Sequence, residues 1–246
     1  MTSRFTPKSF VDSTRRAFRA VNYRYEFVAF PKWCHGTQYY SYDLASPPRE
    51  RLRTALFDRI EEGDVVFDVG AYFGSYALPL ANAGCTVHAF EPSPHNVDRL
   101  RSNFATNPSP DGELIIHEAG LGSGTETRRF YQSSNPGYSS FDRDHIERTG
   151  HDVVSIDEVG VRSIDGLVEE KSVPEPDHIK IDVEGLGQAV LEGASDTLGS
   201  SSPIVYFEPH AVEDGEFRGE QLGRFLGERG YDIHVDGRAW TCTPVD

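Results

Sequence analysis

The stretch VVFDVGAYFG, residues 65–74, decides the fold of this chain. Residues 65–69 form a mostly apolar run that is typical of a buried strand, and residues 75–83 are expected to form a helix. In the loop between them, Gly70 permits a tight turn and Gly74 permits close packing at the start of the helix. Ligands of open α/β sheets lie at the carboxyl ends of such strands. The stretch therefore predicts a ligand-binding loop.

The spacing of the glycines narrows the class of ligand. A loop that binds a dinucleotide reads GxGxxG, and Tyr72 stands here at the position of the second glycine. Close approach of a diphosphate is therefore not provided for, which disfavours NAD and FAD. Glu91 ends the next expected strand, where a carboxylate accepts hydrogen bonds from the ribose hydroxyls of an adenosine.

Strands and helices continue to alternate after this loop. Further strands are expected at residues 86–90, 114–117, 179–183 and 204–207, and helices at 94–103, 188–194 and 221–229. This alternation predicts a mostly parallel, doubly wound sheet. Residues 232–235 and 238–241 flank Asp236-Gly237, which predicts a closing antiparallel hairpin. The region between residues 117 and 179 is interpreted as irregular.

The chain of 246 residues divides into an N-terminal extension, residues 1–60, and a main domain, residues 61–246. Apolar residues recur at helical spacing over residues 10–21, and residues 49–60 suggest a short amphipathic helix. Residues 23–42 are rich in aromatic side chains. They form either a cap packed on the main domain or a wall of the pocket for the second substrate.

The charge balance excludes some partners. The sequence has 39 acidic and 24 basic residues, a formal net charge of −15, which disfavours generic binding to nucleic acid. An acidic, lysine-poor composition fits a high-salt cytoplasm, although a GC-rich genome with an acidic surface is the alternative. No apolar run is long enough to span a membrane, and the N-terminus lacks a secretory pattern. A cytoplasmic protein is expected. The three cysteines contain no CxxC pair, so neither a zinc site nor a disulfide framework is indicated.

Several motifs together resemble those of the FkbM-like S-adenosylmethionine-dependent methyltransferases. Residues 67–71 with Gly74 resemble the first motif of the family. The second motif is matched by Phe90-Glu91-Pro92, Pro94, Asn96, Leu100 and Asn103. The later motifs are matched by residues 161–165, residues 179–185, Val190-Leu191, Gly193-Ala194 and Glu208. The similarity covers about residues 64–210. Three positions depart from the family pattern, because this chain has Tyr72 for Asn, Gly187 for Glu and Gly120 for Ala. The change at Gly187 takes away the carboxylate that the family often has at that position.

The resemblance implies a class I methyltransferase fold, a Rossmann-like, mostly parallel seven-stranded sheet that ends in an antiparallel hairpin. It also implies S-adenosylmethionine as cofactor and methylation of an oxygen, often on a sugar or a natural product. The cofactor would contact residues of the glycine loop, the ends of the second and fourth strands, and the segment after the third strand: Asp68, Gly70, Ala71, Tyr72, Gly74, Glu91, Pro92, Gly120, Leu121 and Asp182.

The strand expected at residues 179–183 carries charges where a central strand should be apolar. Lys180, Asp182 and Glu184 alternate with apolar residues, so they lie on one face. Buried charges are costly unless they are paired or used. The alternatives are an ion pair of Lys180 with Asp182 or Glu184, a role beside the methyl donor and acceptor, and a metal site, for which two carboxylates are few.

A hydroxyl acceptor needs a base, whereas a carboxylate acceptor does not. The candidate catalytic residues are His210, Glu184 and Asp182, with His210 first because its usual pKa suits proton transfer near neutral pH. Ser139 and Ser140 either bond the acceptor or form an ordinary turn.

The sequence therefore predicts an S-adenosylmethionine-dependent O-methyltransferase that acts on a hydroxyl or carboxylate of a sugar, glycan or related metabolite, without a metal. An NAD-dependent oxidoreductase and a non-catalytic domain on the same scaffold are the alternatives. The acceptor and the oligomeric state stay open.

Overall fold

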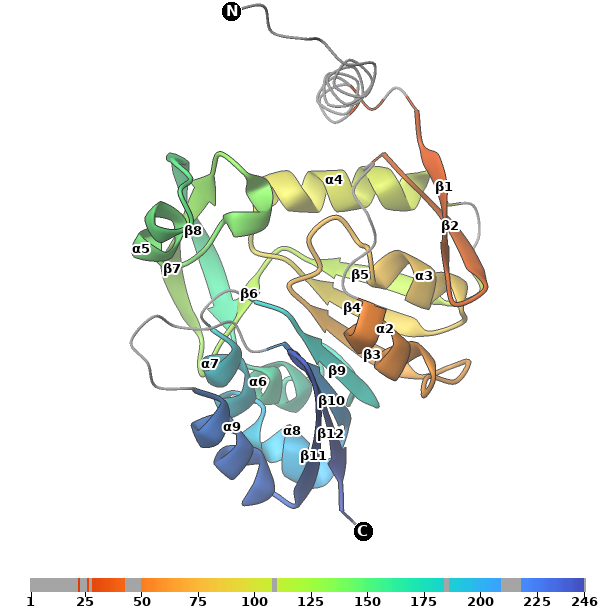
Figure 1. Cartoon of the computed structure of the whole chain (residues 1–246), viewed down its shortest axis with the longest axis vertical. Coiled ribbons are helices and arrows are strands. Elements are labelled where there is room, and N and C mark those ends of the chain that lie inside the picture. Colours follow the sequence, from red (N-terminus) through yellow and green to blue (C-terminus); the bar gives the residue numbers. More distant parts are fainter. Residues whose placement is uncertain are drawn as a thin grey trace, which may run out of the picture.

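The main sheet has seven strands in the order β11-β12-β10-β9-β3-β4-β5 (Figure 1). The computed structural model describes residues 22, 26, 28–42, 50–107, 110–183, 186–208 and 218–245. The strand β12 runs antiparallel to the other six strands, which all point the same way. The strands are β3 (Val65–Val69), β4 (Thr86–Phe90), β5 (Glu113–His117), β9 (His178–Ile181), β10 (Ile204–Phe207), β11 (Tyr231–Asp236) and β12 (Ala239–Pro244). The predicted parallel sheet with its closing hairpin is confirmed.

Two apolar clusters cover the two faces of this sheet, because alternate residues of each strand point to opposite sides. On β3, Val66 joins the cluster with α2 (Glu50–Phe57), α3 (Ala77–Asn82) and α4 (Pro94–Ala105). Its neighbour Phe67 joins the other cluster. That cluster includes residues of α6 (Ile164–Glu169), α7 (Gly187–Glu192), α8 (Ser195–Ser200) and α9 (Arg218–Gly227). The sheet is therefore doubly wound.

The region predicted to be irregular contains a second sheet, so that prediction is wrong. Its strands β6 (Gly120–Leu121), β7 (Glu126–Ser133) and β8 (Val153–Arg162) lie in the order β6-β8-β7. The short helices η1 (Pro136–Tyr138) and α5 (Arg143–Arg148) connect β7 to β8. Most residues of β8 are at least partly exposed, and Arg129 faces Glu158 across the ladder. A strand so open to solvent lacks the apolar run by which the buried strands were found.

The N-terminal hairpin consists of β1 (Phe30–Cys34) and β2 (Thr37–Ser41). Tyr39 is 1% exposed, and β2 packs against α3 and α4. The helix predicted over residues 10–21 lies outside the described residues, whereas the one predicted over residues 49–60 is present as α2. The aromatic segment therefore contains a hairpin packed on the helices of the main domain.

The strand that carries the charged pattern is shorter than predicted. It ends at Ile181, so Asp182 and Val183 follow β9 and are not part of it. Glu184 lies outside the described residues. The end of β9 therefore delivers Asp182 to the carboxyl edge of the sheet, beside the end of β3.

Candidate functional site

A cavity of about 600 Å³ lies at the carboxyl ends of β3, β4, β9 and β10. Residues of the three-stranded sheet and its connections close it on the other side, among them Gly120, Phe130 and Phe141. The strands β4 and β9 lie on opposite sides of β3, so the cavity sits where the order of the strands reverses. That place is where doubly wound sheets bind their ligands.

The loop after β3 is held by backbone hydrogen bonds. The amides of Gly70 and Ala71 donate to the carbonyl of Phe90, at 3.0 and 3.1 Å. Gly70 has φ of 79°, and a Cβ placed there would lie 2.3 Å from the carbonyl oxygen of Asp182. A side chain is therefore excluded at Gly70 by both conformation and space, which confirms the tight turn predicted from the sequence.

Glu91 is the centre of a polar network at the end of β4, and it is 5% exposed. Its carboxylate accepts hydrogen bonds from the amide of Tyr72 at 2.9 Å, the amide of Ser93 at 3.0 Å and the side chain of Asn96 at 3.1 Å. Burial raises the pKa of Glu91, and these three donors oppose the rise. A carboxylate has roughly four acceptor positions, so Glu91 retains the capacity to accept from a ligand hydroxyl.

A buried ion pair joins β3 to β9 below the loop. The ammonium of Lys180 lies 2.8 Å from Asp68 and donates to the carbonyl of Gly70 at 3.0 Å. Burial opposes the charged form of Lys180, but the carboxylates of Asp68 and Asp182 outweigh this effect and raise its pKa. The ammonium also lies 5.0 Å from the centre of the Tyr76 ring. Lys180 therefore forms an ion pair with Asp68, a partner that was not among the alternatives drawn from the sequence, because β3 places that carboxylate directly beside β9.

Carboxylates also lie at the ends of β9 and β10. Asp182 and Glu208 both line the cavity, and Glu208 is 3% exposed, with Arg238 at 3.7 Å. Glu184 and His210, two of the predicted catalytic residues, lie outside the described residues. The sequence singled out Glu208 only as a family position, although its place at a strand end is the signal that marked Asp182.

The strand β7 and its connection to β8 supply an aromatic wall that was not predicted from the sequence. Phe130, Tyr138 and Phe141 line the cavity together with Ser139 and Ser140. The hydroxyl of Ser139 accepts from the amide of Ser133 at 3.0 Å and donates to Gln132 at 3.3 Å. Ser139 therefore has a structural role in the turn. The aromatic residues beside the Pro-Gly turn of η1 were the available signal.

Two of the family departures have a steric reason in this chain. A Cβ on Gly120 would lie 2.7 Å from the ring of Phe141, and one on Gly187 would lie 2.3 Å from the ring of Phe207. Large rings thus occupy the space that side chains fill at these positions elsewhere.

The structure separates the residues predicted to bind the cofactor into two groups. Gly70, Tyr72, Glu91, Pro92, Gly120, Leu121 and Asp182 line the cavity. Asp68, Ala71 and Gly74 do not: Asp68 is fully buried beside Lys180, Ala71 is 2% exposed, and Gly74 packs against Leu100. No residue of the N-terminal hairpin lines the cavity, so the hairpin forms no wall of it within the described residues.

The described residues show neither a cluster of metal-ligating side chains nor a membrane-spanning helix. Residues 28–42, 50–107 and the later described segments contain no group of three or more His, Cys, Asp or Glu side chains placed to hold a metal ion. Of the helices that the structure describes, none combines the length and the apolar character needed to cross a membrane.

The strand order and the cavity at the switch point define a class I methyltransferase fold. The Methyltransferase FkbM domain family matches residues 68–233, so the chain belongs to this family of S-adenosylmethionine-dependent methyltransferases. A crystal structure of methyltransferase FkbM from Methylobacillus flagellatus superposes with a TM-score of 0.51 at 20% identity, over 77% of this chain and 46% of that one.

Two proteins with sequences similar to this chain have names that state their activities. The chain is 35% identical over 162 residues to the hexuronic acid methyltransferase AglP of Haloferax volcanii, covering 65% of this chain and 61% of that protein. It is 29% identical over 185 residues to the 31-O-demethyl-FK506 methyltransferase FkbM of Streptomyces tacrolimicus, covering 63% and 68%. The chain thus matches about three fifths of the length of the first of these relatives.

Proposed function

We propose that this protein is an S-adenosylmethionine-dependent O-methyltransferase that acts on a hydroxyl of a sugar, glycan or related metabolite. The observation that carries the proposal is one cavity lined by Gly70 and Glu91, from the ends of β3 and β4, and by Asp182 and Glu208, from the ends of β9 and β10. Its volume of about 600 Å³ falls in the range of small-molecule sites. The family assignment favours this function over the oxidoreductase and over a non-catalytic domain.

The residues around the loop suit S-adenosylmethionine, which supplies an activated methyl group on a sulfonium. Glu91 would accept from a ribose hydroxyl, and Pro92, Gly120 and Leu121 would border the adenine. Asp182 would face the methionine moiety. Asp68 would not contact the cofactor. It would hold the ammonium of Lys180 in place, and that ammonium donates to the carbonyl of Gly70 at 3.0 Å.

Methyl transfer is an in-line displacement, so alignment and exclusion of water are the protein's main tasks. The aromatic residues Phe130, Tyr138 and Phe141 supply an apolar wall of the cavity. A hydroxyl acceptor also needs a base. Glu208 and Asp182 are the candidates inside the cavity, and His210 and Glu184 remain predictions from the sequence.

The charge of the cavity favours a hydroxyl over a carboxylate acceptor. Glu91, Asp182 and Glu208 line it, whereas the charge of Lys180 is balanced by Asp68 at 2.8 Å. Arg238 at 3.7 Å offsets Glu208, and the sulfonium of the cofactor would offset a second carboxylate. An anionic acceptor would still meet one carboxylate more than these cations balance, and like charges repel strongly where water is scarce. The names of the two relatives, which give a hexuronic acid and 31-O-demethyl-FK506 as substrates, are both compatible with methylation of a hydroxyl.

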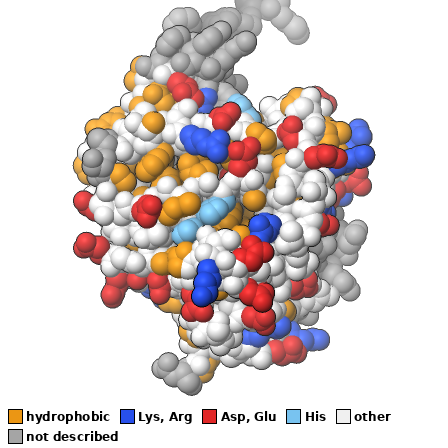
Figure 2. Space-filling model, turned by 180° about the vertical axis from the view of Figure 1, so that it is seen from behind, with side chains coloured by type: hydrophobic (Ala, Val, Ile, Leu, Met, Phe, Trp, Pro, Cys, Tyr) orange, Lys and Arg blue, Asp and Glu red, His pale blue; other side chains and the backbone are white. Residues whose placement is uncertain are grey.

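The acidic surface supports a cytoplasm of high salt as the place of action. Acidic side chains are spread over the face shown in Figure 2, with basic ones among them. On that face the basic side chains are interspersed with acidic ones, and the net charge of −15 disfavours binding to nucleic acid. We propose a small-molecule or glycan acceptor as the partner.

The cofactor site is tested by titration calorimetry with S-adenosylmethionine and with NAD. Glu91→Ala should weaken binding of S-adenosylmethionine by about 1.5–3 kcal/mol, as for loss of a charged hydrogen-bonding partner. Glu91→Gln, which keeps one acceptor oxygen, should lose less. Unchanged affinity in a folded Glu91→Ala protein, or tighter binding of NAD than of S-adenosylmethionine, would contradict the assignment. The acceptor is sought as a mass gain of one CH₂ in glycan and metabolite extracts incubated with the enzyme.

A further inference from the structure

Asn103 connects the N-terminal segment to the glycine loop through the last turn of α4. Its side-chain oxygen accepts from the amide of Tyr42 at 2.8 Å, and its side-chain nitrogen donates to the carbonyl of Phe73 at 2.9 Å. Asn103 is fully buried, so both bonds are shielded from water. One amide side chain thus joins two segments that lie 30 and 61 residues before it in the chain.

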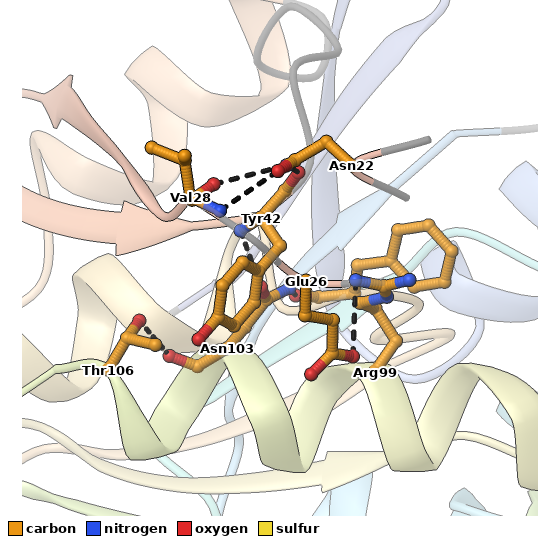
Figure 3. A network of polar contacts seen from close by, with 8 residues as sticks. Asn22, Glu26, Val28, Tyr42, Arg99, Asn103 and Thr106 are labelled. Carbon is orange, nitrogen blue, oxygen red and sulfur yellow. Dashed lines mark hydrogen bonds and ion pairs between the residues drawn. The ribbon is translucent and has the colours of Figure 1, made fainter. Parts of the chain in front are cut away.

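Arg99, one helical turn before Asn103 on α4, makes a second connection between the same two segments. Its guanidinium lies 3.2 Å from the carboxylate of Glu26 and 6.0 Å from the centre of the Phe73 ring. The side chain of Arg99 is 5% exposed and that of Glu26 is 35% exposed. Figure 3 shows Glu26 and Arg99 facing one another over α4, beside Asn103 and Tyr42.

The N-terminal side of this connection is itself fixed. The side-chain nitrogen of Asn22 donates to the carbonyls of Val28 and Tyr42, at 3.1 and 2.8 Å, and its oxygen accepts from the amide of Val28 at 2.9 Å. Asn22 is fully buried. Tyr42 is therefore held at its carbonyl by Asn22 and at its amide by Asn103 (Figure 3).

The loop needs such support because of Tyr72. This residue has φ of 52°, a left-handed conformation that is unfavourable for a residue with a Cβ and persists only where the surroundings hold it. Its ring stacks on Phe73 with centroids 3.6 Å apart, and its amide donates to Glu91 at 2.9 Å. Phe73 is in turn fixed at its carbonyl by Asn103 and approached at its ring by Arg99.

We propose that Asn103 and Arg99 are positioning residues for the cofactor, and that the segment of residues 22–42 belongs functionally to the cofactor site. They hold Phe73 in place, which keeps Tyr72 in the conformation that presents its amide to Glu91. The proposal rests on the proposed function, because it takes the loop as the cofactor site. Under this proposal, the N-terminal hairpin and the main domain act as one functional unit and not as an extension and a separate catalytic domain.

Two variants of one residue separate the bonds of Asn103. Asn103→Asp keeps an oxygen for the amide of Tyr42 but removes the donor to Phe73, whereas Asn103→Ala removes both. Asn107→Ala is the matched control: Asn107 accepts from the amide of Tyr40 at 2.7 Å and donates to its carbonyl at 2.8 Å. It therefore ties the same hairpin to the chain after α4. Its side-chain nitrogen also donates to the backbone carbonyl of Asn103 at 2.7 Å, but none of these bonds involves the side chain of Asn103 or reaches the loop.

We expect both Asn103 variants to bind S-adenosylhomocysteine about three- to tenfold more weakly, the range for one net hydrogen bond. Without ligand, amide hydrogen exchange of residues 72–75 should be faster in both, because the local opening free energy falls. Asn107→Ala should keep wild-type affinity and wild-type exchange in the loop. Glu26→Gln, which weakens the pair with Arg99 at a partly exposed position, should speed loop exchange about two- to fivefold and serves if the Asn103 variants do not fold.

Folded Asn103 variants with wild-type affinity and loop exchange would overturn the proposal. Equal losses in Asn107→Ala would also overturn it, because they would show general destabilisation of the hairpin. Absence of S-adenosylhomocysteine binding by the wild-type protein would overturn the proposed function instead. Loop exchange in the ligand-free variants would still decide whether Asn103 positions the loop.

Discussion

The half of the cavity formed by β3 and β4 differs from the half formed by β9 and β10 in the carboxylates that line it. In the first half, Glu91 accepts from two backbone amides and from Asn96. In the second half, the carboxylates of Asp182 and Glu208 line the cavity at the ends of their strands. The first half therefore presents one carboxylate that the fold holds by three hydrogen bonds, whereas the second presents two carboxylates at adjacent strand ends.

This difference suggests a division of labour. Groups that are held by several hydrogen bonds are preorganised and contribute to binding in a defined geometry. Carboxylates that face a cavity at the next two strand ends are placed to act on the reacting atoms. We therefore expect substitutions in the first half to change affinity for the cofactor and substitutions in the second half to change turnover.

The largest expected effect is on turnover in the second half. Glu208→Gln should lower single-turnover methylation of a hydroxyl acceptor by about 10²–10⁴-fold, the usual contribution of a positioned base. Affinity for S-adenosylhomocysteine should stay close to wild type. His210→Ala, measured in parallel, tests the base that the sequence favours. If both variants keep wild-type turnover on a hydroxyl acceptor, the second half does not supply a base from these positions.

The next largest effect concerns the ion pair that joins the two halves. Lys180→Met leaves the fully buried Asp68 without its counter-charge and should lower the free energy of unfolding by about 3–5 kcal/mol. The double variant Asp68→Asn with Lys180→Met removes both charges and should recover part of this loss. Urea unfolding measures both. A Lys180→Met protein as stable as wild type would show that the pair does not support the sheet.

A smaller effect is expected from the histidines at the β4–β5 edge. Nδ1 of His88 lies 2.9 Å from Nε2 of His117, and burial together with the neighbouring His117 lowers the pKa of His88 to about 4. In the unfolded chain this pKa is about 6.5, so between these values the unfolded state binds more protons. Stability is therefore retained above about pH 6.5 and falls as the pH drops toward about 4.

Unfolding curves across this pH range check the histidine prediction. His88→Gln cannot take up the proton and should show a shallower loss of stability on acidification than wild type. Neither histidine lines the cavity, so affinity for the cofactor measured at neutral pH should not change. An identical pH slope in wild type and variant would assign acid sensitivity to other groups.

The smallest expected effect is that of salt concentration on the thermal stability, because it is spread over many surface charges. With a net charge of −15, screening should relieve self-repulsion and favour the compact state. The thermal midpoint should rise between low and molar KCl, and it should rise less in a variant in which exposed acids are replaced by their amides. A midpoint that is flat or falls with salt would leave the acidic composition without this explanation.

Much of the fold followed from local patterns. The apolar runs of β3, β4 and β10 are buried between two layers of helices, and a continuous apolar run is the mark of such strands. Gly70 and Glu91 were also identified from local patterns, because a tight turn and a strand end each restrict the type of residue at one position. The sheet of β6, β7 and β8 was missed because its exposed strands carry charged and polar residues that obey no such constraint.

The sequence by itself determined the doubly wound sheet, the turn at Gly70 and the position of Glu91 at the end of β4. Only the tertiary structure decided that Lys180 pairs with Asp68, that Phe141 covers Gly120 and that Asn103 ties Tyr42 to the glycine loop. The physical reason is that strand, turn and helix preferences are set by neighbours in the chain, whereas each of these contacts joins residues at least 20 positions apart. The register of neighbouring strands and the packing of helices decide which partner a buried charge or amide contacts. Neither can be predicted from a local sequence pattern.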